Sequence, residues 1–304
     1  MNIIKDNPED IKAQFLESKT ACIGTFDGMH LGHQELLLNT KKVGNGAYSV
    51  VTFSELPQIT LQSADFKLIT SNKQKEKIFS SFDTTNLIYL DFSCIRNYTP
   101  DNFCELLANK YNINEIVIGD DFKFGKDRKG DASFLRKYFG NDNVVTVPTK
   151  LINKEKVSST KIRELLYKGQ VESASKLLGR PYNLEAKVVK GDGFGKELGF
   201  PTANLEIEKH ILPRVGVYAV RVYIQNLRED LIGMMNIGYR PTVSSNDELR
   251  VEVNIFDFNF DIYGTNLSLE IISLLREEKR FNGIDELKTQ LLKDKQNSIN
   301  KLKS

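Results

Sequence analysis

The sequence is poor in the residues that mark several classes of protein. Its 304 residues include no tryptophan, three cysteines and three histidines, and 42 Lys and Arg nearly balance 40 Asp and Glu. The resulting net charge of +2 offers no strong attraction for nucleic acid or an anionic membrane surface. No stretch approaches the roughly 18 apolar residues of a membrane span, and the N-terminus lacks the features of a secretory signal. We therefore expect a cytoplasmic protein that binds neither nucleic acid nor membrane.

Cysteine and histidine are too scarce for most disulfide or metal frameworks. Cys22, Cys94 and Cys104 are an odd number with no paired-ligand spacing, so we expect buried thiols in a reducing compartment. Two of the three histidines, His30 and His33, lie three residues apart. Any histidine chemistry is expected at this pair.

The first half of the sequence alternates strand-like and helix-like segments. Runs rich in β-branched and aromatic residues cover 21–26, 48–53, 86–92, 115–122 and 143–149. Helical spacing of apolar residues occupies 34–42, 73–79, 101–111 and 133–139. This alternation predicts an α/β domain with a parallel sheet. Because ligands of such sheets bind beyond the carboxyl ends of strands, the turns after strands are the candidate sites.

The pattern changes after Gly179 and Pro181, which end a helical stretch. Beyond them, alternating strand-like segments follow one another with few helical periods, at 184–191, 216–224, 231–238, 250–258 and 267–277. We expect an α/β domain over 1–180 and a compact β-barrel or sandwich over 181–304. The leucine spacing in 284–302 predicts an amphipathic helix that covers the β module.

The segment from Gly24 to His33 follows a predicted strand and opens a helix. Its glycines allow close backbone approach, and the helix start presents free N–H groups and a positive dipole end, which favour a phosphate. His30 and His33 are placed to donate hydrogen bonds to phosphate oxygens. Taken alone, an H-x-x-H pair also fits two metal ligands or two ordinary turn histidines, although no third metal ligand stands at a recognisable spacing.

Two further segments favour the same chemistry. Gly119 to Gly125, with the sequence GDDFKFG, follows another strand. In VSSTKIR at 157–163, the hydroxyl residues are good helix-start residues, and Arg163 in the first turn offers fork-shaped contacts to phosphate. Each segment alone occurs in many proteins that do not bind phosphate. The occurrence of all three in this order is what indicates a phosphate or nucleotide site.

These three motifs carry a family resemblance. GTFDGMHLGH at 24–33 resembles the HxGH signature of nucleotidyltransferases, in the form found in bacterial bifunctional riboflavin kinase/FMN adenylyltransferases. The segments at 119–125 and 157–163 resemble that family's G-x-D-F-x-F-G and S-S-T-x-I-R motifs. The resemblance implies that His30, His33 and Arg163 serve adenylylation. It implies nucleotide or flavin contacts for Gly24, Phe26, Asp27, Gly28, Gly32, Asp121, Phe124, Gly125, Ser158, Ser159 and Thr160.

A glycine-rich segment, Gly191 to Asn204, opens the second module. It is not a Walker phosphate loop, because Lys190 stands at the first glycine position and Glu197 stands where Ser or Thr is needed. Its glycines also miss the dinucleotide fingerprint. It resembles the riboflavin kinase signature G-x-x-x-G-R-x-x-G-F-P-T-A-N, with Lys196 in place of the usual arginine. The resemblance implies ligand contacts for Gly191, Gly195, Lys196, Gly199 and Pro201.

Later residues of the second module fit the same family. In extended backbone Thr202 and Asn204 point to the same side and offer two oxygens to one Mg²⁺, a role that the resemblance also assigns to them. NIGYRPT at 236–242 resembles the family's N-I-G-x-R-P-T, and LREEKRF at 275–281 resembles its L-R-x-E-x-x-F. The resemblance implies that Asn236 and Arg276 bind substrate or nucleotide.

Glu252 is the candidate base of the second module. In the predicted strand at 250–258, Val251, Val253 and Ile255 share one face, so Glu252 need not enter the apolar core. Taken alone, a strand glutamate is usually a solvated residue. The segment resembles the family's V-E-x-H-I-x-D-F, whose glutamate is the catalytic base, with Asn254 in place of the common histidine.

The resemblance implies a two-module enzyme. With ATP and Mg²⁺ it would phosphorylate riboflavin to FMN, then adenylylate FMN to FAD with release of pyrophosphate. Thr52 to Pro57 lacks the family's T-F-x-P-H-P loop, so a riboflavin kinase with a weak or inactive adenylyltransferase is an alternative. A third hypothesis is a flavin-sensing or nucleic-acid-binding protein without turnover, which the near-neutral charge disfavours. A homo-oligomer is a possible assembly.

Overall fold

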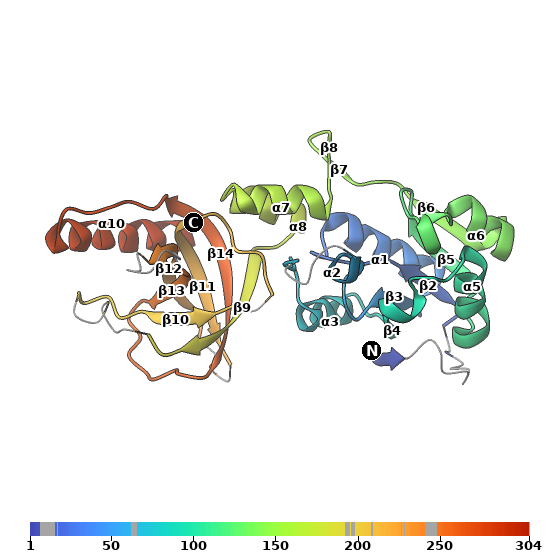
Figure 1. Ribbon diagram of the computed structural model, residues 1–304, viewed down its shortest axis with the longest axis horizontal. Helices are drawn as coiled ribbons and strands as arrows, with labels where there is room; N and C mark the ends of the chain where they lie inside the picture. The colour runs from blue at the N-terminus through green and yellow to red at the C-terminus, as the bar shows by residue number, and fades with distance from the viewer. Residues whose placement is uncertain are drawn as a thin grey trace. The chain divides into compact units, whose positions relative to one another are not determined.

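The chain forms two compact units, Met1–Ser159 and Thr160–Ser304. The computed structural model describes residues 1–6, 16, 18–61, 66–191, 195, 198–207, 209–225, 227, 229–240 and 248–303. Figure 1 shows the two units, with the sheet of the first in blue to green and the barrel of the second in yellow to red.

Six strands form the sheet of the first unit, and every pair in it is parallel. They are β1 Asn2–Asp6, β2 Thr20–Ile23, β3 Ser49–Phe53, β4 Asn86–Leu90, β5 Glu115–Gly119 and β6 Val144–Val147, in the order β1-β4-β3-β2-β5-β6. The predicted parallel sheet is confirmed. The order reverses direction at β2, which lies between β3 and β5. The carboxyl ends of β2 and β5 therefore flank the switch point at which ligands of such sheets bind.

Helices cover the sheet because successive strand residues enter two different cores. Cys22, Val50 and Leu87 belong to one buried cluster, whereas the residues that follow each of them belong to the other. The helical segments are α1 Leu31–Val43, α2 Pro57–Leu61, α3 Asn72–Ser81, α4 Phe92–Ile95, α5 Pro100–Glu105, the π-helical η1 Leu106–Lys110, the 3₁₀ turns η2 Lys126–Arg128 and η3 Asn141–Asn143, and α6 Ala132–Phe139. A hairpin of β7 Leu151–Ile152 and β8 Glu155–Lys156 follows β6.

The sequence pattern missed the first strand. β1 pairs in parallel with β4 at the edge of the sheet. It contains only two adjacent apolar residues, of which Ile4 is buried and Ile3 is exposed. Such a short edge strand has too few residues to show a period of two, so its pairing is fixed by tertiary contacts.

The second unit is a closed six-stranded barrel, which decides between the predicted barrel and sandwich. Its strands are β9 Tyr182–Val189, β10 Ala203–Glu206, β11 Gly216–Ile224, β12 Leu231–Arg240, β13 Glu248–Ile255 and β14 Asn266–Arg276, in the closed order β10-β13-β12-β11-β14-β9. The predicted C-terminal helix is α10, Ile284–Lys303, which packs along β11, β12 and β14 (Figure 1). Within the described ranges, no helix combines the length and apolar character needed to cross a membrane.

Helices α7 Ser159–Tyr167 and α8 Val171–Leu178 group with the barrel by their contacts. The backbone N–H of Arg214 donates to the carbonyl of Leu166, and the hydroxyl of Ser273 donates to Glu172 at 2.6 Å. The predicted boundary near residue 180 instead follows the change from helices to strands.

Candidate active sites

The turn between β2 and α1 has a constrained backbone. Phe26, Gly28 and Met29 have φ angles of 51°, 87° and 45°. Side chains rarely tolerate this left-handed region, and Phe26 and Met29 adopt it while fully buried. Strain of this kind persists where packing holds it, which is common at ligand sites.

The histidine pair lies at the start of α1. His30 is the N-cap, and its Nδ1 accepts a hydrogen bond from the backbone N–H of His33 at 3.3 Å. The two rings stack with centroids 3.7 Å apart. A Cβ on Gly32 would lie 3.2 Å from the His30 ring, so glycine at this position leaves room for the imidazole. The structure therefore brings the two predicted histidines together at a helix N-terminus.

Asp27 anchors this turn rather than lining a surface. Its side chain is 4% exposed and Oδ1 accepts hydrogen bonds from the backbone N–H groups of Ile69 and Thr70 at 3.0 and 3.4 Å. Its carbonyl accepts a bond from the hydroxyl of Ser159 at 2.7 Å. The first and third motifs are thus joined directly.

The remaining residues of the third motif surround the start of α7. Ser158 precedes the helix, Ser159 is its first residue, and Thr160 and Arg163 lie in its first turns. Ser159 ends the first unit, and Thr160 and Arg163 belong to the second. Arg163 therefore stands about one helical turn beyond the serine that bonds to the Asp27 carbonyl.

The second motif, Gly119 to Gly125, contains both buried packing residues and a solvent-exposed residue. Phe124 is buried and packs beside Phe103, with ring centroids 5.3 Å apart. Gly125 has φ of 70°, and a Cβ there would lie 2.9 Å from the backbone nitrogen of Pro100. Asp121, by contrast, is exposed and pairs with Lys156 of the β7–β8 hairpin at 2.6 Å. The contacts of Phe124 are those of a core residue, and Asp121 is the solvent-facing member of the motif.

The loop that lacks the family's Pro-His-Pro lies at the carboxyl end of β3. The backbone N–H of Ser54 donates to the carbonyl of Leu90 at 3.0 Å, and the side chain of Asn72 donates to the carbonyl of Ser54 at 2.7 Å. Leu56 is buried. Because β3 neighbours β2, this loop stands on the same edge of the sheet as the histidine turn.

Lys75 is a residue that the sequence patterns did not single out. It lies in the first turns of α3 and is 2% exposed. Burial lowers the pKa of Lys75 to about 8, partly opposed by attraction to Asp27 and Glu76. A lysine in a helix pattern rich in lysine carries no sign of burial, so only the fold reveals it.

The lowered pKa of Lys75 predicts a pH-dependent stability. Between about pH 8 and the ordinary value of 10.5, the unfolded chain holds this proton and the folded chain does not. Lys75 should therefore contribute a rise in the free energy of unfolding of the first unit across this window, by on the order of 3 kcal/mol at most. Burial raises the pKa of the Cys22 and Cys104 thiols, which act in the opposite direction, so the Lys75 contribution is measured as a difference between variants. Lys75→Met should lower the pH slope relative to the parent protein, whereas Lys73→Met, at an exposed position of the same helix, should keep the parent slope.

Thiol labelling in urea measures this effect in the first unit alone. All three cysteines belong to that unit, and Cys22 and Cys104 are buried. Equal pH slopes in the parent protein and Lys75→Met would contradict the assignment of the titration to Lys75.

The barrel carries a cavity of about 560 Å³ on its wall. Five predicted residues, from four separate strands and the glycine-rich segment, line it: Gly195, Asn204, Asn236, Glu252 and Arg276. Thr202, which precedes β10, is a sixth. Its other walls are Leu198, Phe200, Val217, Met234, Gly238, Tyr239, Arg250, Asn254, Glu278, Lys279, Phe281, Leu287 and Leu291. The structure thus gathers six of the predicted residues of the second module into one site.

Glu252 occupies the middle of a polar row on this wall. In the antiparallel register it stands opposite Asn204 of β10 on one side and Asn236 of β12 on the other. Directly opposed residues share a face of the sheet, so the carboxylate lies between two amides. Glu252 is half-buried in the cavity rather than solvated on an open face.

Local packing explains several motif residues beside this row. A Cβ on Gly191 would lie 1.8 Å from Asn204 Nδ2, and a Cβ on Gly195 would lie 2.4 Å from the carbonyl oxygen of Phe200. Asn254, which replaces the family's histidine, is 5% exposed and donates to the carbonyl of Pro201 at 2.6 Å. The Asn254 side chain therefore holds the Pro201 backbone in place.

Four predicted positions, Gly191, Lys196, Gly199 and Pro201, are not among the described walls of the cavity. Gly199, with φ of 82°, and Pro201 shape the turn before β10 without lining the cavity. Lys196 lies outside the described residues, as do Pro241 and Thr242 of the N-I-G-x-R-P-T segment.

The oxygen ligands of the cavity fit Mg²⁺ in its usual nucleotide-bound form. Thr202 contributes a hydroxyl, Asn204 an amide oxygen and Glu252 a carboxylate to the same cavity. Mg²⁺ prefers oxygen ligands and completes its shell with phosphates and water. Within the described part of the chain, no three His, Cys, Asp or Glu side chains cluster as a metal site, which also leaves the H-x-x-H pair without a third ligand.

Sequence reasoning missed the apolar walls of this cavity and the cation of Arg250. Arg250 stands two positions before Glu252 on the same strand, and residues two apart on a strand share one face of the sheet. This spacing was the signal that could have placed Arg250 in the cavity. Phe200, Met234 and Leu291 come from a loop, a strand and a helix, and no local pattern connects them. Together they give the cavity an apolar surface beside its polar row.

Comparisons with known proteins match both units. A family model described as FAD synthetase matches residues 12–161, and one described as riboflavin kinase matches 178–302. Two curated proteins, each named bifunctional riboflavin kinase/FMN adenylyltransferase, align over nearly the whole chain. The one from Buchnera aphidicola is 36% identical over 90% of both chains, and the one from Bacillus subtilis is 35% identical over 91% of this chain and 90% of its own.

A solved structure matches over the whole length. The crystal structure of a protein named as a macrolide-efflux protein, from Streptococcus pneumoniae, is 35% identical, with a TM-score of 0.88 over 99% of each chain. The full-length likeness extends to both the parallel-sheet unit and the barrel.

Proposed function

Because the chain belongs to the family of bifunctional riboflavin kinase/FMN adenylyltransferases, we propose that it makes FAD from riboflavin in two ATP-dependent steps. The barrel phosphorylates riboflavin to FMN and releases ADP. The parallel-sheet unit transfers AMP from a second ATP to FMN and releases pyrophosphate. The observation that carries the proposal is the presence of both family domains, each with a site built from its own motif residues.

In the kinase step Glu252 acts as the general base. It accepts the proton of the ribityl 5′-hydroxyl as the oxygen attacks the terminal phosphorus of ATP, and the bond from that phosphorus to the ADP oxygen breaks. Asn204 and Asn236 stand on either side of Glu252 in the sheet register. The apolar wall around Phe200, Met234 and Leu291 accommodates a flat aromatic ring.

Thr202 and Asn204 are the residues that would hold Mg²⁺, with Glu252 in the same cavity. When bound with ATP, the ion neutralises charge that develops on the phosphates. Gly191 contributes by leaving room for the Asn204 amide. Arg276 and Lys279 add positive charge to the cavity, which attracts the negatively charged phosphates of the nucleotide.

In the adenylyltransferase step the nucleophile is already an anion. A phosphate oxygen of FMN attacks the α-phosphorus of ATP, and pyrophosphate leaves, so alignment and charge stabilisation suffice. His30 Nδ1 accepts a bond from the His33 backbone, so the proton of the neutral ring lies on Nε2, which donates toward phosphate. The N-terminus of α1 adds backbone N–H groups and a positive dipole end. The role proposed for Arg163 in adenylylation rests on the S-S-T-x-I-R motif alone.

The alternative of a kinase with a silent adenylyltransferase is not favoured. The FAD synthetase model matches residues 12–161, so the match runs through the altered loop at 54–57. The histidine pair and its supporting glycine keep an ordered geometry. We propose that the loop's contacts with β4 and α3 replace the missing Pro-His-Pro as its support.

The partners of the protein are small molecules, namely riboflavin, FMN and ATP. A cytoplasmic location, the lack of nucleic-acid or membrane binding and a homo-oligomeric assembly stay predictions from the sequence. The domain boundary near residue 180 is likewise a proposal, which agrees with the riboflavin kinase match starting at residue 178.

Separating the flavins after incubation with ATP and Mg²⁺ tests the proposal. Riboflavin should give FMN and then FAD, with ADP and pyrophosphate as co-products. Riboflavin that remains unchanged in the presence of both would overturn the kinase assignment.

A further inference from the structure

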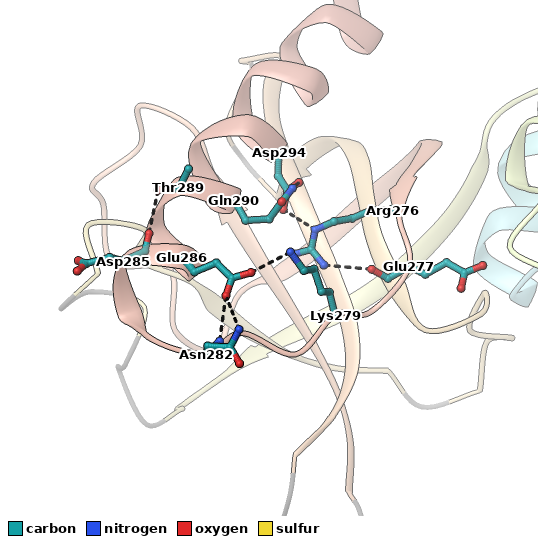
Figure 2. A network of polar contacts seen from close by, with 9 residues as sticks. All are labelled: Arg276, Glu277, Lys279, Asn282, Asp285, Glu286, Thr289, Gln290 and Asp294. Carbon is teal, nitrogen blue, oxygen red and sulfur yellow. Dashed lines mark hydrogen bonds and ion pairs between the residues drawn. The ribbon is translucent and has the colours of Figure 1, made fainter.

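A buried carboxylate on α10 contacts one of the cations of the kinase cavity. Asp294 is 1% exposed, and its Oδ2 lies 2.9 Å from Arg276 Nε. Its Oδ1 accepts a hydrogen bond from the side chain of Gln290, one turn earlier in the helix, at 2.8 Å. Figure 2 shows the Arg276 side chain reaching from the end of β14 toward α10, where Asp294 contacts it and Gln290 contacts Asp294.

The guanidinium of Arg276 is held on three sides. Besides the Nε contact, Nη1 donates to the carbonyl of Glu277 at 3.1 Å, and the ring of Phe281 lies 5.5 Å from Cζ. In the described part of the chain, no hydrogen bond to a protein acceptor uses Nη2. Arginine has five N–H donors in a rigid planar group. Because Nε and Nη1 are held by protein acceptors, Nη2 is the nitrogen that can donate to a ligand.

This arrangement differs from the other ion pairs near α10. The Lys279–Glu286 pair is solvent-exposed on both sides, so its orientation is loosely held. Asp294 is buried, and removing one partner of a buried pair leaves a charge without compensation. A buried carboxylate against a cavity-lining arginine therefore fixes the guanidinium before any ligand arrives, which lowers the entropic cost of binding.

We propose that Asp294 is a positioning residue that aims Arg276 at the phosphates of the nucleotide. This inference rests on the proposed kinase function and deepens it. It makes α10 part of the active site through a polar contact, in addition to the apolar wall that Leu287 and Leu291 supply. ATP is an anion and riboflavin is uncharged, so the two substrates should respond differently to a loosened guanidinium.

Steady-state kinetics of Asp294→Asn test this difference. The variant keeps the size of the side chain and removes its charge, and the KM for ATP should rise about tenfold, because a charge-assisted contact to phosphate is weakened. The KM for riboflavin should stay within about twofold of the parent value. Asp285→Asn, the same change at an exposed position of α10, should leave both constants unchanged. FMN adenylylation in the other unit gives an internal control for the amount of active protein.

Two further variants keep the proposal testable if Asp294→Asn folds poorly. Gln290→Met removes one hydrogen bond to Asp294 and should raise only the KM for ATP, by about twofold to threefold. In an Arg276→Lys background, which lacks the fork, Asp294→Asn should add little to the KM for ATP. Equal rises in the KM for both substrates, or fully additive effects of the two substitutions, would show a merely structural role. A parent protein without kinase activity would instead overturn the proposed function.

Discussion

Replacing Glu252 with glutamine is expected to slow riboflavin phosphorylation by about 10² to 10⁴-fold, the usual contribution of a general base. Glutamine has nearly the same shape and keeps a hydrogen-bonding oxygen between Asn204 and Asn236. It cannot accept the proton of the ribityl hydroxyl. The loss should therefore fall on kcat, with the KM for both substrates little changed.

Two controls accompany the Glu252→Gln variant. Glu206→Gln makes the same change at an exposed position of the neighbouring strand β10 and should retain full kinase activity. FAD formation from supplied FMN should be intact in both variants, because neither residue belongs to the motifs of the adenylyltransferase. Parent-like phosphorylation by Glu252→Gln would remove Glu252 from the role of base.

Replacing His30 with asparagine is expected to slow FAD formation from FMN by about 10² to 10³-fold, comparable to the loss of one preorganised donor to a developing charge. Asparagine is among the best N-cap residues, and its side-chain oxygen accepts the backbone N–H of His33 as the imidazole does. The start of α1 should therefore survive while the ring donor is lost.

Comparison with His30→Ala separates capping from chemistry. Alanine removes both the ring and the cap, so it should lower the free energy of unfolding by about 1 kcal/mol more than asparagine does. The two variants should share the same catalytic defect, with riboflavin phosphorylation unaffected in each. If His30→Asn made FAD at the parent rate, the ring would have no part in adenylylation.

The elements that the sequence predicted well are those with a complete local pattern. The runs of β-branched and aromatic residues at 48–53 and 86–92 and the helical spacing of 34–42 correspond to β3, β4 and α1. Five of the six barrel strands were predicted equally well, because each has an apolar face, whereas the four-residue strand β10 was missed because it is too short to show a period of two. By contrast β1 has too few residues to show a period, and the contact grouping of α7 and α8 with the barrel depends on packing that no local pattern encodes.

The candidate sites were predictable where a motif keeps its residues close in sequence. Ordered motifs placed His30 beside His33, and the register of the barrel then placed Glu252 between two amides that lie 48 and 16 residues away, at Asn204 and Asn236. The burial of Lys75 and the pairing of Arg276 with Asp294 had no such signal. Both depend on distant elements meeting, which sequence spacing does not report.

The most direct test of a two-step enzyme is the flavin product formed from FMN alone. Purified protein incubated with FMN, ATP and Mg²⁺ should form FAD and pyrophosphate in equal amounts, just as riboflavin should give FMN and then FAD. FMN that persists unchanged, while riboflavin is still phosphorylated, would contradict the two-step account and leave a riboflavin kinase whose first unit is silent.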